Sequence, residues 1–194
     1  MVDPAERHDK LSHQEYLALE EAEGLRYEYL AGEVFAMTGG AENHAFISLA
    51  TGAALLDAFR GKPCRVFGLD RKLFIAAADK FCYPDAMVLC EEGRHDKLHV
   101  EGPALIVEVL SESTESYDRG LKFEHYRAIE SLEYYLLLAQ DRLHAELFQR
   151  QGPDRWLLTE ASGEEGVIRL ERWGIDLQLS ELYRQVEFDK EHQS

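Results

Sequence analysis

The fold is decided by two apolar stretches, Cys82-Tyr83-Pro84-Asp85-Ala86-Met87-Val88-Leu89 and Ala104-Leu105-Ile106-Val107-Glu108-Val109-Leu110. Each predicts a buried strand that carries one carboxylate, Asp85 in the first and Glu108 in the second. An ionised carboxylate within an apolar run is costly unless a cation or hydrogen bonds compensate it. Two such strands lying side by side would therefore share a cation.

The positions of the two acids within their strands favour a common site. Asp85 follows Pro84, and proline favours the start or the edge of a strand because it has no backbone donor. Glu108 lies near the end of its strand, where ligands gather in open sheets. Neighbouring carboxylates of this kind could hold Mg²⁺, which takes one or two protein carboxylates and keeps several waters. Mn²⁺ suits the same oxygen ligands. Alternatively, Glu108 pairs with a basic residue of the core.

A helical pattern predicted from about Asp118 to Ile129 offers the third charged group, Lys122. Lys122 stands four residues after Asp118, so the two could form a simple surface ion pair. Lys122 also shares a helical stripe with Tyr126. If this stripe faces the sheet, the ammonium reaches the carboxylates, where it could hold an attacking water or stabilise developing charge.

The remaining patterns predict strands interleaved with helices, which indicates an α/β or α+β fold with helices packed beside a mixed sheet. Ser12 and Glu15 predict a capping box at the start of a helix that ends before Gly24. Alternation on both sides of Ala31-Gly32 predicts a β-hairpin. Further elements are predicted as a helix over 42–59, a turn over 76–80, a charged loop over 90–102, strands near 65–75, 133–138, 143–150, 156–159 and 167–170, and a short closing helix over 179–186.

The length of 194 residues is typical of one domain with a sizeable core. We predict a flexible N-terminus over residues 1–10, a single domain over 11–188 and a loose tail over 189–194. The sequence has no apolar run of membrane-spanning length and begins without an apolar signal segment, which predicts a cytoplasmic protein. Its three cysteines are Cys64, Cys82 and Cys90. Their spacing suggests neither a disulfide framework nor a zinc site, so we expect free thiols.

The formal net charge of −16 argues against a nucleic-acid partner, because such proteins usually present a basic surface. DNA binding would require basic residues gathered around the site or neutralisation by metal ions. A basic track that favours DNA could come from Arg65, Arg71, Lys72, Arg119 and Arg127.

Several of these segments, in this order, resemble a known family. Pro84-Asp85, Glu108-Val109-Leu110-Ser111, Asp118-Arg119-Gly120-x-Lys122 and Tyr126-Arg127 are similar to the Uma-two family of restriction endonucleases. This family is a branch of the PD-(D/E)XK nuclease superfamily. The likeness extends to Leu30-Ala31-Gly32-Glu33-Val34, His44 and Glu133-Tyr134-Tyr135-Leu136-Leu137, and so covers about residues 10 to 180.

The resemblance implies a restriction-endonuclease-like core and Mg²⁺-dependent hydrolysis of phosphodiester bonds. Asp85 and Glu108 match the two superfamily acids. Leu110 stands where many members have the lysine, and Lys122 on the following helix resembles its replacement in this branch. Glu33 resembles an additional metal-binding acid, although it could be a solvated hairpin residue. His44 could contact a phosphate at a helix start, or have no catalytic role.

Three functional hypotheses follow from these observations. The first is a Mg²⁺-dependent DNA endonuclease with Asp85, Glu108 and Lys122 as its catalytic residues. The second is a catalytically inactive module on a nuclease fold that binds nucleic acid or protein. The third is a metal-dependent hydrolase of a smaller phosphoester. A homodimer would suit an enzyme that cuts both strands, and Tyr134, Tyr135 and Trp156 could supply its interface unless they pack in the core.

Overall fold

The computed structural model describes residues 10–37, 39–90 and 93–188. The two ends predicted to be flexible, 1–10 and 189–194, lie outside these ranges except for Lys10. Within the described ranges, no helix combines the length and the apolar character needed to cross a membrane.

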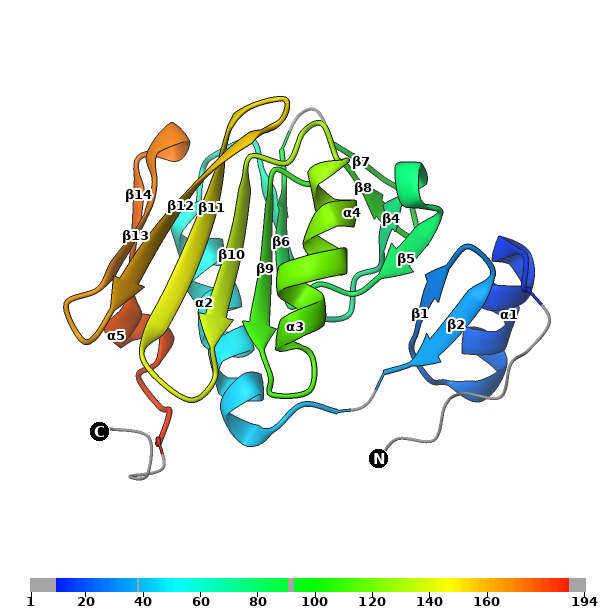
Figure 1. Ribbon diagram of the computed structural model, residues 1–194, viewed down its shortest axis with the longest axis horizontal. Coiled ribbons are helices and arrows are strands. Elements are labelled where there is room, and N and C mark those ends of the chain that lie inside the picture. Colours follow the sequence, from blue (N-terminus) through cyan, green and yellow to red (C-terminus); the bar gives the residue numbers. More distant parts are fainter. Residues whose placement is uncertain (1–9, 38, 91–92, 189–194) are drawn as a thin grey trace.

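A mixed six-stranded sheet forms the centre of the molecule, as predicted (Figure 1). Its order is β12-β11-β10-β9-β6-β3. The central pair β9 and β10 is parallel, and all other pairs in this sheet are antiparallel. The strands are β3 (Arg65–Gly68), β6 (Ala86–Leu89), β9 (Leu105–Leu110), β10 (Tyr134–Ala139), β11 (His144–Gly152) and β12 (Arg155–Ser162).

Helices cover both faces of this sheet (Figure 1). The long helix α2 (Glu42–Ala58) packs on one face, where Val107 and Val109 join its buried residues in one core. The opposite face carries α3 (Glu115–Tyr117), the π-helical turn η2 (Asp118–Lys122) and α4 (Phe123–Arg127). Ile106 and Tyr126 belong to the core on that side. Because side chains alternate along a strand, Glu108 points toward α4 and away from α2.

A second six-stranded sheet, ordered β2-β1-β5-β4-β8-β7, lies beside α4. Its strands are β1 (Tyr27–Leu30), β2 (Glu33–Ala36), β4 (Leu73–Ile75), β5 (Lys80–Cys82), β7 (Arg94–His95) and β8 (Val100–Glu101). The described chain also contains α1 (His13–Glu23), η1 (Ala76–Ala78), β13 (Val167–Leu170), η3 (Glu171–Trp173), β14 (Ile175–Gln178) and α5 (Leu179–Leu182).

The local signals at the N-terminal end of the chain are confirmed. Ser12 and Glu15 form the complete capping box of α1, and Gly24 ends the helix in the left-handed conformation with φ of 65°. Residues Ala31 and Gly32 join β1 to β2 with φ of 48° and 98°. Two positive φ angles suit the twist of a two-residue hairpin connection, and glycine adopts such an angle without steric cost.

Four predicted elements differ in detail. Leu49 and Leu56, expected on the apolar face of the long helix, are 73% and 61% exposed, because Ser48 and Thr51 turn toward the sheet instead. Lys80 is the first residue of strand β5 and does not belong to the preceding turn. The helix predicted from Asp118 begins at Glu115 and is interrupted by the π-helical turn. The predicted charged loop over 90–102 contains the short strands β7 and β8.

The aromatic residues considered for a dimer interface lie mostly in the core. Tyr134 and Tyr135 are buried on opposite faces of the central sheet, and Trp156 is half-buried. Tyr134 and Tyr135 therefore supply no interface, and the homodimer stays a prediction.

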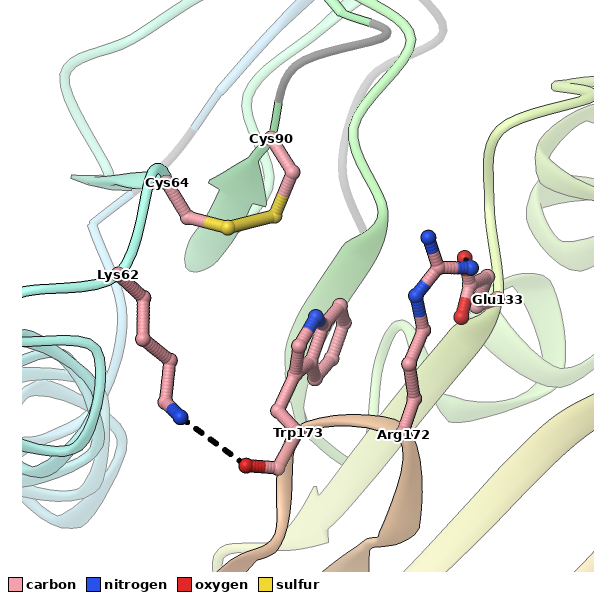
Figure 2. Close-up of a disulfide and its surroundings, with 6 residues drawn as sticks. All are labelled: Lys62, Cys64, Cys90, Glu133, Arg172 and Trp173. Carbon is pink, nitrogen blue, oxygen red and sulfur yellow. Dashed lines mark hydrogen bonds and ion pairs between the residues drawn. A yellow bond between two sulfur atoms is a disulfide. The ribbon is translucent and has the colours of Figure 1, made fainter.

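The expectation of three free thiols is wrong, because Cys64 and Cys90 form a disulfide (Figure 2). The pairing Arg65↔Leu89 between β3 and β6 makes these cysteines the next opposed pair of the ladder. This register, rather than their spacing along the chain, brings them together. The disulfide lines a cavity of about 350 Å³ with Lys62 and Trp173. Cys82 is a free cysteine and is buried.

We expect one thiol per chain to react with a thiol reagent after denaturation without reductant, and three after reduction. In the native chain Cys82 should react very slowly, because burial raises the pKa of its thiol to about 12. Reduction of the disulfide, which joins residues 26 apart, should lower the free energy of unfolding by about 3 kcal/mol. Thiol titration and chemical denaturation with and without reductant measure these effects. Three reactive thiols in the unreduced, denatured chain would contradict the disulfide.

Candidate functional site

The two predicted acids lie side by side. Strands β6 and β9 are antiparallel neighbours with Ala86 opposite Val107, which brings Asp85 to the end of β9. The backbone N–H of Val109 donates to Asp85 Oδ2 at 2.6 Å. Asp85 is 6% exposed and Glu108 is 4% exposed, so both carboxylates are withdrawn from water.

Lys122 reaches Glu108 from the helical segment over the sheet. Its Nζ lies 2.9 Å from Glu108 Oε1 and 3.1 Å from Asp118 Oδ1. The pairing of Lys122 with Asp118 is thus buried, and the alternative of a simple surface ion pair is wrong. The hydroxyl of Tyr126 also donates to Glu108 Oε1, at 2.6 Å. Two donors from one side of the sheet therefore fix the orientation of the Glu108 carboxylate.

A second lysine and a further acid, which the sequence patterns did not indicate, extend this cluster. Lys80 is fully buried on β5, with its Nζ 3.3 Å from Glu28 Oε2 on β1. Tyr117 donates to the same Glu28 oxygen at 2.9 Å and contacts Lys80. Glu28 Oε1 lies 3.8 Å from Lys122 Nζ, which joins the two halves. No local signal marks Glu28, because its alternation with Tyr27 and Tyr29 is also typical of a solvent-facing strand residue.

Of the other two predicted site residues, His44 lies at the cluster and Glu33 lies away from it. His44, in the first turn of α2, places its Nε2 3.4 Å from Asp85 Oδ2. A hydrogen bond to Asp85 raises the pKa of His44 above its usual value, against the effect of burial. Glu33 is exposed at the start of β2, paired with Leu30 beside the hairpin turn. The structure therefore does not bring Glu33 to the cluster, whereas Glu28 of the same hairpin lies near both lysines.

Burial and like charges shape the protonation of the cluster. Burial, reinforced by Asp118 and Asp85, raises the pKa of Glu108 to about 8, although Lys122 and Tyr126 act in the opposite direction. Burial disfavours the charged form of Lys122, but Glu108, Asp118 and Glu28 outweigh it and hold the pKa of Lys122 well above its usual value. Lys122 is therefore a permanent ammonium group, and Glu108 needs more positive charge to stay ionised at neutral pH.

The donor set of the cluster fits a divalent cation. Four carboxylates, Glu28, Asp85, Glu108 and Asp118, stand against the two ammonium groups of Lys80 and Lys122, which leaves a formal charge of −2 with His44 neutral. Among the described residues, Asp118 Oδ1 is buried without an aligned hydrogen bond, although Lys122 Nζ is close. Carboxylate oxygens are the ligands that Mg²⁺ and Mn²⁺ prefer.

Comparison with known proteins places the chain in a family. The model of the Uma2 family, described as "Putative restriction endonuclease", matches residues 13–180. The chain belongs to the Uma2 family. The chain is also similar to other proteins over almost its whole length. It is 32% identical over 186 residues to the uncharacterized protein slr1290 of Synechocystis sp. (strain PCC 6803), covering 95% of this chain and 97% of that relative.

A second relative from the same organism, the uncharacterized protein sll1609, is 35% identical over 161 residues, covering 81% of this chain and 91% of the relative. The fold of this Uma2 member is also similar to a crystal structure from Anabaena variabilis, described as "a putative nuclease belonging to DUF820". The TM-score is 0.67 at 13% identity, over 83% of this chain and 91% of the other. At this identity the likeness concerns the fold.

Replacing Lys122 with methionine should destabilise the metal-free protein by about 3 kcal/mol near pH 8, because it leaves buried carboxylates without their cation. The loss of stability should be smaller at about pH 5.5, where those carboxyl groups can take up protons. The sign follows from the raised pKa of Glu108: a carboxyl group that holds its proton more tightly in the folded state stabilises the fold at low pH, and this contribution disappears as pH rises toward 8. Chemical denaturation at both pH values measures the difference.

Tyr126→Phe serves as the comparison for this variant, since it removes one donor to Glu108 and no charge. It should cost about 1–2 kcal/mol. An equal loss for Lys122→Met at both pH values would contradict the role of Lys122 as the buried counter-charge.

Proposed function

We propose that this protein is a metal-dependent endonuclease that hydrolyses phosphodiester bonds in DNA, on a restriction-endonuclease-like core. The observation that carries the proposal is the buried group of Asp85, Glu108 and Lys122, in which Lys122 lies 2.9 Å from Glu108 and Asp85 accepts the backbone N–H of Val109 beside it. Membership of the Uma2 family and the shared fold with the Anabaena variabilis protein support it.

Asp85 and Glu108 would hold the metal ion, Mg²⁺ or Mn²⁺, with their carboxylate oxygens. When bound, such an ion supplies Lewis acidity and lowers the pKa of a coordinated water. The protein fixes both ligands in advance, through the Val109 N–H on Asp85 and the Tyr126 hydroxyl on Glu108. Preorganised ligands avoid the free-energy cost of ordering these side chains when the ion arrives.

Lys122 would act on the reacting phosphate or on the attacking water. Its ammonium group carries a permanent charge and lies within hydrogen-bonding distance of Glu108, so it can orient a water beside the metal ligand or stabilise charge on a phosphate oxygen. His44 could contribute a phosphate contact from the start of α2, where backbone N–H groups also favour an anion.

The acidic character of the chain favours the alternative, a catalytically inactive module for nucleic acid or protein. The net charge is −16, and several cations of the anticipated basic track serve the fold. Lys72 is buried against Glu20, Arg71 binds the backbone carbonyls of 96, 97 and 99, and Arg119 pairs with Glu115 and Glu146. A smaller phosphoester would meet less electrostatic repulsion than DNA.

Nicking of supercoiled plasmid with Mg²⁺ or Mn²⁺ tests the proposal. The wild type should nick the plasmid only with the metal, and Glu108→Gln and Lys122→Met should each lower the rate by about 10²-fold or more. Glu124→Gln, which removes an exposed acid from the neighbouring helix α4, is the matched control and should cleave at the wild-type rate.

Calorimetric titration of Mg²⁺ separates binding from catalysis. Asp85→Asn should lose metal binding, whereas Lys122→Met should retain it, because the lysine is not a ligand. Unchanged metal binding in Asp85→Asn would refute the site. Normal metal binding without cleavage of plasmid, RNA or a small phosphodiester would favour the inactive module.

A further inference from the structure

Three side chains with metal-binding atoms lie together at the outer edge of the central sheet. His144 and Glu146 belong to β11, Glu160 belongs to the edge strand β12, and one ligand atom from each lies within 4.8 Å of the others. Glu146 and Glu160 are directly paired across the two strands. The regular ladder between these strands holds the three side chains on one face of the sheet, on rigid backbone.

The charges of this group call for a cation. Two carboxylates directly opposite each other on neighbouring strands repel and destabilise the pair. Arg119 contacts Glu146 through Oε2, and Glu146 Oε1 lies instead 3.4 Å from His144 Nε2. Glu146 is 8% exposed, so its charge is poorly screened by water. A cation bound between the two glutamates would turn their repulsion into shared ligation.

The imidazole of His144 is held in the orientation that a metal ligand requires. Its Nδ1 lies 2.9 Å from the hydroxyl of Ser162, the residue directly opposite on β12. When Nδ1–H donates to this hydroxyl, Nε2 carries the free lone pair and faces Glu146. Histidine ligands in metal sites are typically fixed by such an outer hydrogen bond.

The separation of two of the ligand atoms matches zinc. Nitrogen and oxygen ligands lie about 2.0–2.2 Å from Zn²⁺, so two of them at the tetrahedral angle are about 3.4 Å apart. The separation of His144 Nε2 and Glu146 Oε1 is 3.4 Å. Arg119 uses the other oxygen of Glu146, so an ion on Oε1 need not displace the guanidinium.

We propose that His144, Glu146 and Glu160 form a binding site for a divalent transition-metal ion, with Zn²⁺ as the best match. One imidazole and two carboxylates suit Zn²⁺, whereas Mg²⁺ prefers oxygen ligands alone. The three protein ligands leave one tetrahedral position for water, on the open side next to the exposed Glu160. The site shares no residue with the group of Asp85, Glu108 and Lys122, although Glu146 lies two strands from Glu108 on the same face of the sheet. Its occupancy does not depend on nuclease activity.

Calorimetric titration of Zn²⁺ into the full chain, with excess Mg²⁺ present throughout, tests this site. We expect the wild type to bind one zinc ion that Mg²⁺ does not displace. His144→Ala and Glu160→Gln should each weaken this binding by about tenfold or more, since even the outer partners of a metal ligand contribute that much. Glu160 is exposed, so its substitution leaves the packing of the core intact.

Two matched controls remove the same chemical groups elsewhere. His95→Ala deletes an exposed imidazole, and Glu164→Gln neutralises an exposed acid in the loop after β12. Both should bind zinc like the wild type, and circular dichroism should confirm that all variants are folded. A wild type that binds no zinc, or equal zinc affinity in the wild type, His144→Ala and Glu160→Gln, would overturn the proposal.

Discussion

Placing the carboxylate of Glu108 within an apolar sheet face has a large free-energy cost, and the surrounding side chains are arranged to offset it. The ammonium group of Lys122 and the hydroxyl of Tyr126 both meet one oxygen of this carboxylate. These contacts fix η2 and α4 against the sheet. Asp118, Glu28 and Lys80 lie around the same group of charges. One buried acid thus brings together five elements of the chain, which are β9, η2, α4, β1 and β5.

The geometry of the two acids depends on strand register. Asp85 accepts the backbone N–H of Val109, one residue beyond Glu108, so the carboxylates keep a fixed separation while β6 and β9 stay paired. A slip of one residue would turn Glu108 to the face covered by α2, where it would meet Ile47 and Leu55 in place of a lysine. The apolar residues that alternate with Glu108 thus protect the site by making that slip costly.

Sequence patterns predicted a site residue where a single strand or helix contained all the residues of the pattern. Single acids in apolar runs indicated Asp85 and Glu108, and helical spacing indicated Lys122. The contact between Lys80 and Glu28 could not be predicted, because it depends on the pairing of β1 with β5, which no local pattern encodes. The disulfide could not be predicted for the same reason, since only the β3–β6 register brings its cysteines together. Long-range pairing, rather than local propensity, accounts for these omissions.

Lys122 and Glu108 are held in place by different kinds of contact. Glu108 belongs to a strand joined by backbone hydrogen bonds on both sides, whereas Lys122 and Asp118 belong to a short helical segment held by side-chain packing, such as Phe123 stacked on Tyr135 at 5.0 Å. Segments held in this way open locally at a lower free energy than central strands do. Lys122 can therefore move away from Glu108 while the central sheet stays folded. The ion pair between them is then lost at a lower free energy than the fold itself.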